Sequence, residues 1–154
     1  MAERRTPGAK SRARAVARKL AMQALYQWQL NAQPWQDLCA QHRHDEDMAR
    51  ADQGYFEELV RGVLEGAAEF DQELTVDLDR QPGGLDPVEH AILLIGAYEL
   101  ARRPDVPFRV VITEGVGLAK RFGATDGHKY VNAVLDRLAR RLRAAETGGP
   151  AAVV

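Results

Sequence analysis

Apolar residues recur at intervals of three and four in almost every segment of this chain, which is the spacing of one face of an α-helix. The longest such run extends from Gly54 to Asp79, or about seven turns at ~3.6 residues per turn. The opposite face is acidic, as expected when one face lies in the core and the other in water. We therefore predict one long helix with these inward residues: Phe56, Leu59, Val60, Val63, Leu64, Ala67, Phe70, Leu74 and Leu78.

The same spacing predicts helices over residues 10–30, 86–102, 108–122 and 126–142. A shorter helix is predicted over residues 35–40, because Pro34 is well tolerated where a helix begins. The β-branched run 110–113 would favour a strand in isolation, but its apolar spacing continues to Phe122 and favours a helix. Every predicted element is therefore helical.

The helix predicted over residues 86–102 has three agreeing start signals. Asp86 can cap it, Pro87 fits its first turn, and Glu89 can complete a capping box. Gly96 lies in its interior, where glycine costs ~1 kcal/mol relative to alanine. We therefore expect another helix to approach closely at Gly96.

The segment 120–138, KRFGATDGHKYVNAVLDRL, combines a helix end, a cap and a second helix. Gly123 is expected to end the first helix in a left-handed conformation, and Thr125 or Asp126 to cap the next. The polar residues Asp126, His128 and Lys129 then lie at a positively polarised helix N-terminus. This polar corner is a candidate functional site.

Breaks in the pattern divide the chain into parts. Residues 1–9 contain Pro, Gly and charge without periodicity, and we predict a disordered basic arm. The run QPGG at 81–84 separates an N-terminal bundle, 10–82, from a C-terminal bundle, 83–146, and 147–154 is predicted to be a flexible tail. For a chain of 154 residues we predict an all-α fold of two small helical bundles packed against each other.

The net charge of −1 conceals a strong asymmetry along the chain. Residues 1–20 carry seven Lys or Arg against one acid, and residues 118–143 carry seven against two. Residues 43–89 carry fourteen acids against four bases. Basic ends around an acidic middle indicate a polyanionic partner at one surface and a different partner at another.

Cellular location follows from composition and cysteine usage. The sequence has no run of the ~20 apolar residues needed to span a bilayer and no apolar signal-peptide core. The single cysteine, Cys39, excludes an intramolecular disulfide framework and suits a reducing compartment, where we expect a structural role for it. These features predict a cytoplasmic protein that does not enter a membrane.

The first predicted helix has a basic ridge beside its apolar face. Arg12, Lys19 and Tyr26 repeat every seven residues, and Arg14 and Arg18 lie one turn apart beside them. Cations that pair with phosphates and an aromatic ring that stacks on an unpaired base suit single-stranded RNA. The alternative is a solvated basic face without a ligand. The candidate RNA-binding residues of this helix are Lys10, Arg12, Arg14, Arg18, Lys19 and Tyr26.

Residue patterns of an enzyme or a metal centre are not found in the sequence. The glycine pairs lack the strand–turn–helix context of a phosphate-binding loop, and the four histidines are scattered. His42, His44, Asp45 and Asp47 do not have the spacing of a closed metal site, so a solvated acidic loop is the better interpretation. We therefore expect a binding protein without a cofactor or metal.

Three blocks of the sequence resemble the NusB family of bacterial transcription antitermination factors. They are ARKLAMQALYQWQL, DPVEHAILLIGAYEL with the following RPDVPFRVVITEGVGLAKRFG, and KRFGATDGHKYVNAVLDRLA. Together they cover most of the chain between about residues 14 and 139. The resemblance implies the same all-α fold of two helical bundles.

The resemblance also implies a function and partners. NusB-like proteins bind the boxA element of nascent RNA together with the small-subunit ribosomal protein NusE. That complex joins an antitermination assembly on RNA polymerase, notably during transcription of ribosomal RNA. We therefore expect recruitment of partners rather than catalysis, and a homodimer stays open as an alternative use of an apolar helix face.

Family RNA contacts come from the arginine-rich first helix and from an HK–aromatic–VN motif. The resemblance transfers these contacts to five residues: Arg14, Arg18, Tyr26, Lys129 and Tyr130. Tyr130 replaces a common Phe and also lies on the apolar stripe of its helix, so the sequence leaves open whether it faces RNA or the core.

Glu89 and Asp126 match family positions implicated in the NusE interface and in tuning RNA affinity. Glu89 also has a purely structural explanation as a capping residue. Gly127 departs from the Ser usual in the family, and Gly115 and Gly117 from a helix usually richer in Ala and Glu.

Two other functions remain open at this stage. The chain resembles the NusB-like domain found in certain RNA cytosine methyltransferases, where it would serve as the substrate-binding part of an enzyme. It could also be a helical adaptor that binds protein alone, although seven Lys or Arg within the first twenty residues argue against that.

Overall fold

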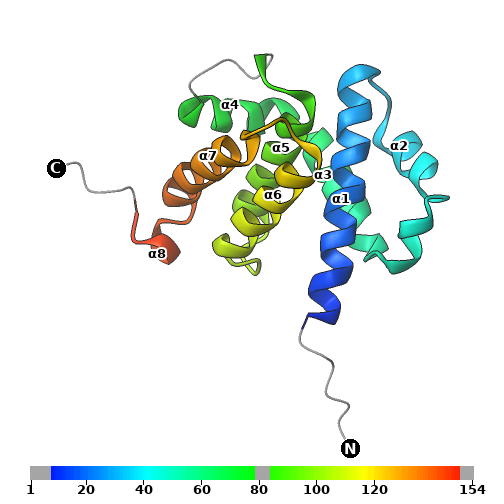
Figure 1. The fold of residues 1–154 in the computed structure, drawn as a ribbon, viewed down its shortest axis with the longest axis horizontal. Helices are drawn as coiled ribbons and strands as arrows, with labels where there is room; N and C mark the ends of the chain where they lie inside the picture. The colour runs from blue at the N-terminus through cyan, green and yellow to red at the C-terminus, as the bar shows by residue number, and fades with distance from the viewer. Residues whose placement is uncertain (1–7, 79–83, 150–154) are drawn as a thin grey trace, which may run out of the picture. The chain divides into compact units, whose positions relative to one another are not determined.

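The computed structural model describes residues 8–78 and 84–149, and within these ranges it contains helices and no strand. None of the described helices is long and apolar enough to cross a membrane. The elements, shown in Figure 1, are α1 Ala9–Leu30, α2 Trp35–His42, the 3-10 helix η1 Glu46–Arg50, α3 Gln53–Glu65, α4 Ala67–Asp77, α5 Pro87–Arg102, α6 Phe108–Phe122, α7 Gly127–Leu142 and α8 Ala144–Thr147. The all-α prediction is confirmed.

The chain divides into two compact units, Met1–Gly62 and Val63–Val154. The boundary predicted at residues 82–83 lies outside the described residues. Within the second unit, α4 packs on α5 and α7. The predicted arm, 1–9, and tail, 147–154, lie largely outside the described residues, and the described part of the arm begins α1 at Ala9.

The first unit is organised around α1, which packs against α2 and η1. Its buried side chains include Leu20, Leu25, Leu38 and Leu59. The predicted acidic loop contains η1, which Asp45 caps by accepting a hydrogen bond from the Asp47 amide. Buried Met48 anchors η1 to the core, whereas His44, Asp45 and Glu46 are exposed, so the acidic segment is solvated as predicted but contains a 3-10 helix.

The predicted single helix over residues 54–79 is wrong: α3 ends at Glu65 and α4 begins at Ala67. Gly66 separates them, with φ −119° and ψ 16°. The Phe70 ring, 2% exposed, packs over Gly66, where a Cβ would lie 2.8 Å from a ring carbon. The apolar spacing continues through the break because residues on both sides are buried, and periodicity alone therefore did not reveal it.

In the second unit, α5, α6 and α7 pack on one another, and their closest approach occurs at Leu135 of α7. A Cβ added to Gly96 of α5 would lie 2.5 Å from the Leu135 side chain, and one added to Gly115 of α6 would lie 2.8 Å from it. Leu135 is fully buried. The predicted close approach at Gly96 is thus confirmed, and Gly115 forms the second wall of the same slot.

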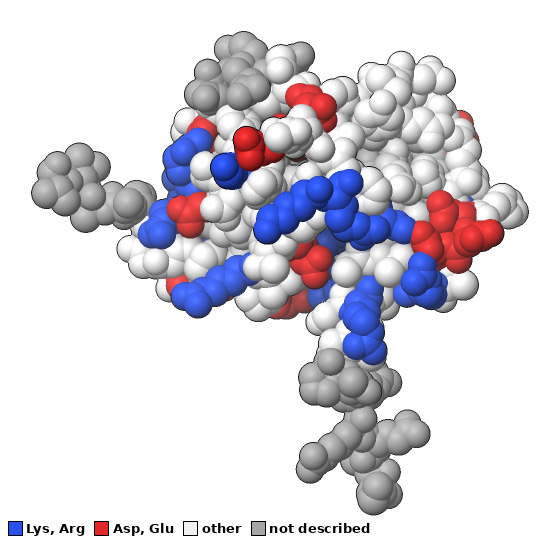
Figure 2. All heavy atoms as spheres, in the orientation of Figure 1, with Lys and Arg blue, Asp and Glu red and all other residues white. Residues whose placement is uncertain are grey.

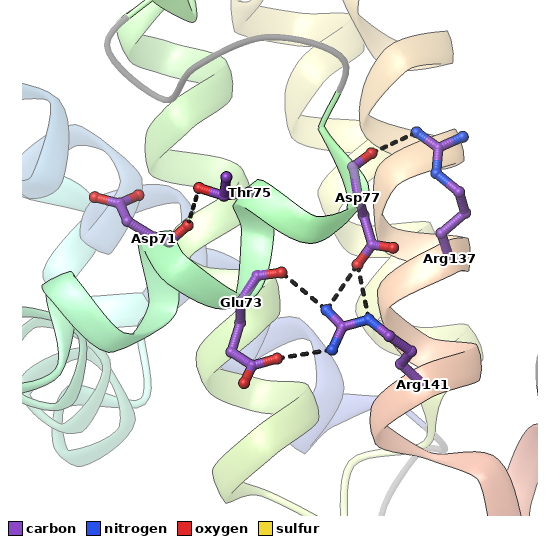
Figure 3. A network of polar contacts seen from close by, with 6 residues as sticks. All are labelled: Asp71, Glu73, Thr75, Asp77, Arg137 and Arg141. Atoms are coloured by element: carbon purple, nitrogen blue, oxygen red, sulfur yellow. Dashed lines mark hydrogen bonds and ion pairs between the residues drawn. The ribbon is translucent and has the colours of Figure 1, made fainter.

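Two arginines of α7 attach that helix to α4, as Figure 3 shows. Arg141 donates to the Glu73 carbonyl at 2.8 Å, to the Glu73 carboxylate at 2.9 Å and to Asp77 Oδ2 at 2.8 Å. Arg137 donates to the Asp77 carbonyl at 2.8 Å. Because Glu73 and Asp77 lie in the last turns of α4, these cations also meet the negative end of its helix dipole.

The end of α7 is fixed to the end of α5 by Arg143, which is 9% exposed. Its guanidinium donates to the carbonyls of Glu99, Leu100 and Arg103, at 3.1, 2.8 and 2.8 Å. It also donates to the Val106 carbonyl at 3.0 Å, in the connection to α6. The Glu99 and Arg103 carbonyls also accept from the backbone amides of Arg103 and Val106, so Arg143 adds a second donor to these two groups and joins the C-terminal ends of the two helices.

The helix ends can be compared with the capping and terminating residues predicted from the sequence. Asp86 caps α5 as predicted, accepting from the amides of Val88 and Glu89 at 2.9 and 3.3 Å. Gly123 is not left-handed, however, since its φ is −86° and its ψ 178°. A Cβ there would lie 2.8 Å from the Ala119 carbonyl oxygen, so close backbone approach explains this glycine instead.

Replacing Gly96 with alanine should destabilise the protein by about 1–3 kcal/mol, because the new methyl group overlaps Leu135. Gly117→Ala is the matched control, since nothing lies within 4 Å of a Cβ at that helical position. That change should stabilise the protein by about 0.5–1 kcal/mol. Urea unfolding of both variants measures the two changes in the free energy of unfolding. Equal changes would contradict the close approach of Leu135 to Gly96.

Arg141→Met should lower the free energy of unfolding by about 1–3 kcal/mol, because it leaves the Glu73 carbonyl and the largely buried Asp77 carboxylate without their donor. Arg140→Met is the control, since Arg140 pairs with Asp136 on the surface, at 3.0 Å. Its loss should cost about 0–1 kcal/mol. Chemical denaturation gives both free energies of unfolding. A change for Arg141→Met no larger than that for Arg140→Met would contradict the role of Arg141 in attaching α7 to α4.

Candidate RNA-binding surfaces

The basic residues of α1 fall into an exposed group and a covered group. Lys10 and Arg12, in its first turn, are exposed. Figure 2 shows Lys and Arg side chains at this described start of α1. The first turn of α1 contains no acidic residue that could pair with them.

Arg14 and Arg18 contact the ring of Tyr55 near the start of α3. Their guanidinium carbons lie 4.5 and 5.5 Å from the ring centroid, within the range of a cation–π interaction. Arg14 is half-buried, whereas Arg18 is only 3% exposed. The prediction that Arg18 lies on an exposed ridge is therefore wrong, because the side chain is held inside the first unit.

Lys19 is also covered, with 14% of its side chain exposed, and it forms an ion pair with Asp47 of η1. Arg50 pairs with the same carboxylate. Hydrogen bonds from Lys19 and Arg50 hold the pKa of Asp47 below its ordinary value, so it stays ionised at neutral pH. The heptad ridge predicted through Arg12, Lys19 and Tyr26 is thus interrupted by an internal ion pair.

The aromatic end of the predicted ridge is accessible. Tyr26 is 39% exposed, enough to offer part of its ring to a base. Trp28, two residues further along α1, is half-buried. The α1 surface therefore retains both cations and an aromatic ring, although fewer cations than the sequence indicated.

The second candidate surface is the start of α7. Asp126 precedes this helix and has a φ of 64°. Among the described residues other than glycine, it is the one with a positive φ, and its side chain makes no capping hydrogen bond. It lies 3.4 Å from the Lys129 ammonium instead. The predicted side-chain cap at Asp126 is wrong, and both charged groups are exposed, at 66% and 73% of their side chains.

Tyr130 follows Lys129 and is half-buried. Its neighbours on the apolar stripe, Val131 and Val134, are fully buried. Part of the Tyr130 side chain therefore contributes to packing and part remains accessible, and its contact with RNA stays a prediction. His128 is half-buried as well.

Glu89 lies against the start of α7 rather than on an open surface. It is 6% exposed, and a Cβ on Gly127 would lie 2.5 Å from its Oε2 atom. A larger residue at 127 would have to displace this carboxylate. The glycine at this position therefore permits an inward conformation of Glu89 that leaves little of it for a partner.

Three residues at the first surface were not predicted: Asp47, Arg50 and Tyr55. These residues reach the surface of α1 because η1 and the start of α3 pack near it. The sequence does not show this packing, because Lys19 and Asp47, for example, are 28 residues apart. The acidic run before Met48 indicated that a carboxylate here could form an ion pair, but it did not indicate with which cation.

The buried thiol of Cys39 offers no reactive chemistry. Burial, together with the nearby Glu57 carboxylate, raises the pKa of Cys39 to about 11. The thiol therefore stays protonated near neutral pH, and thiolate is the nucleophilic form. This agrees with the structural role expected from the sequence.

Comparison with known proteins shows which family this chain belongs to. The sequence profile of the NusB family matches residues 15–140. The transcription antitermination protein NusB of Marinobacter nauticus is 53% identical over 131 residues, 85% of this chain and 83% of that protein. The NusB protein of Nitrosomonas europaea is 48% identical over 145 residues, 94% of this chain and 86% of that protein.

Solved structures show the same fold. A structure of T. maritima NusB matches with a TM-score of 0.71 and 25% identity, covering 82% of this chain and 90% of that one. A crystal structure of the antitermination factors NusB and NusE in complex with dsRNA matches with a TM-score of 0.68 and 24% identity. It covers 82% of this chain and 95% of that one.

Arg18→Ala should lower the free energy of unfolding by about 1–3 kcal/mol, because Arg18 is buried and contacts Tyr55. Arg12→Ala, at an exposed site, should change stability by no more than about 0.5 kcal/mol. Thermal or urea unfolding measures both. If Arg18→Ala were as stable as wild type, the buried placement of Arg18 would be incorrect.

Proposed function

Because the chain belongs to the NusB family, we propose that it acts in transcription antitermination by binding RNA together with a protein partner. The family match over residues 15–140 carries this proposal. The mechanism is recruitment: the protein holds RNA on basic and aromatic side chains and presents another surface to the partner, with no chemical step.

The described residues supply two candidate RNA contacts. On α1 these are Lys10 and Arg12 with the exposed ring of Tyr26. At the start of α7 they are Lys129 and the accessible part of Tyr130. Cations pair with phosphates and aromatic rings stack on unpaired bases, at about 1–3 kcal/mol per stacked base.

Arg14, Arg18 and Lys19 have a supporting role in this proposal. Arg14 and Arg18 hold Tyr55 against α1, and Lys19 holds η1 through Asp47. They fix the elements beside the exposed cations, and the half-buried Arg14 is the one of the three with surface left for RNA. A variant at Arg18 therefore tests stability before it tests binding.

The specific ligands in this proposal are boxA-type single-stranded RNA and the ribosomal protein NusE. With them, the protein would join an antitermination complex on RNA polymerase, notably during ribosomal RNA transcription. Support comes from the crystal structure of NusB and NusE in complex with dsRNA, which has a similar fold. The partner surface would include exposed Asp126, whereas Glu89 would contribute only where its carboxylate is displaced from Gly127.

Fluorescence anisotropy of labelled RNA tests the proposal directly. The protein would be titrated into boxA-type RNA, a scrambled RNA and a duplex of the same length, with and without the NusE-like partner. Preference for boxA-type RNA that strengthens with the partner is the expected result. Equal binding to all three would leave only generic affinity for polyanions, and no binding would favour a protein-only adaptor.

Tyr26→Leu should weaken RNA binding by about five- to a hundredfold, because it removes an exposed stacking surface worth about 1–3 kcal/mol. Tyr26→Phe is the matched control, since it retains the ring and should bind within about twofold of wild type. Both variants should unfold like wild type because the side chain is exposed. Equal affinity of Tyr26→Leu and wild type would remove Tyr26 from the RNA surface.

A further inference from the structure

A hollow lies at the start of α1, on the first unit. Ala9, Ala13 and Val16 follow one another at helical spacing along it, and Ala15 adds to its apolar lining. Its volume is about 480 Å³, within the ~300–1,000 Å³ of sites that hold small organic groups. The hollow is therefore large enough for one nucleotide.

Two guanidinium groups line this apolar hollow. Arg12 belongs to α1 and Arg50 to the end of η1, so they approach it from different elements. Arg50 is strongly exposed, at 70% of its side chain. An apolar lining with two cations suits a nucleotide, which has an apolar base face and anionic phosphates on either side.

Arg50 is held at this place by Asp47. The same carboxylate binds Lys19 of α1 and Arg50 of η1, joining the two elements through one acid. Figure 2 shows acidic and basic side chains next to one another on this face. The carboxylate occupies a position beside Arg50 that a phosphate oxygen would otherwise take, so Asp47 competes with RNA for Arg50.

We propose that this hollow binds one nucleotide of single-stranded RNA, with Arg12 and Arg50 on its flanking phosphates, and that Asp47 limits the affinity by competing for Arg50. The inference rests on the proposed RNA-binding function and adds a binding residue, Arg50, and an attenuating residue, Asp47. Neither of them was a candidate RNA-binding residue in the sequence.

The test uses the full chain and a labelled boxA-type RNA, titrated at several salt concentrations. Arg50→Gln should bind about fivefold more weakly at ~0.1 M salt, and its log K versus log salt slope should be shallower by ~0.7, the value for one phosphate contact on a single strand. Arg43→Gln is the matched control, because Arg43 is an exposed arginine of the same unit that does not line the hollow. Its affinity should equal that of wild type.

Asp47→Asn should act in the opposite direction. It preserves the size of the side chain but removes the charge that competes for Arg50, so affinity should rise about fivefold at ~0.1 M salt. Urea unfolding of each variant separates this effect from instability. An affinity for Asp47→Asn equal to or below that of wild type, with the fold intact, would overturn its attenuating role.

A third measurement asks whether a base occupies the hollow. RNAs with one abasic nucleotide at each position in turn would be titrated with wild type and with Arg50→Gln. If Arg50 holds the nucleotide in the hollow, one abasic position should cost less in the variant than in wild type, because the two losses concern one contact site. Strictly additive losses at every position would exclude the nucleotide subsite.

The outcomes distinguish this inference from the proposed function. Wild-type protein that binds none of the RNAs would overturn both. Wild-type binding with an unchanged salt slope for Arg50→Gln would overturn only the subsite. Displacement of the RNA by polyglutamate at equal charge concentration would show a generic anion site, which also contradicts it.

Discussion

Leu135 fills a slot between two glycines, Gly96 on α5 and Gly115 on α6, and the arrangement of the second unit depends on this approach. A side chain at either glycine would overlap the methyl groups of Leu135, so that the Leu135 side chain or α7 would have to shift. Arg143 then fixes the far end of α7 to the carbonyls at the end of α5. The exposed start of α7, with Lys129, is therefore carried by a helix held both along its length and at its C-terminus.

Internal ion pairs determine which cations of the first unit remain for RNA. Lys19 and Arg50 share Asp47, and Arg14 and Arg18 share the ring of Tyr55. A basic helix thus divides into cations that hold the unit together and cations that face solvent. This division reconciles a strongly basic first helix with a surface whose affinity for RNA can be limited by the protein's own acid.

The sequence predicted much of the fold correctly, and its errors have physical reasons. The helices around Trp35, Pro87 and Phe108 begin where proline and capping signals predicted them. The break at Gly66 was missed because burial continues on both sides of it. Gly123 was assigned the wrong conformation because a glycine needed for close approach looks the same in sequence as a left-handed one.

Periodicity, proline and capping residues by themselves determined that this chain is helical and roughly where its helices begin, because those signals act within a few residues. The blocks ARKLAMQALYQWQL and KYVNAVLDRLA likewise carried the family resemblance. Only the tertiary structure decided that Arg18 is buried, that Lys19 is paired and that Glu89 lies against Gly127. Those outcomes depend on residues far apart in sequence, and a side chain's exposure is set by whichever element packs over it.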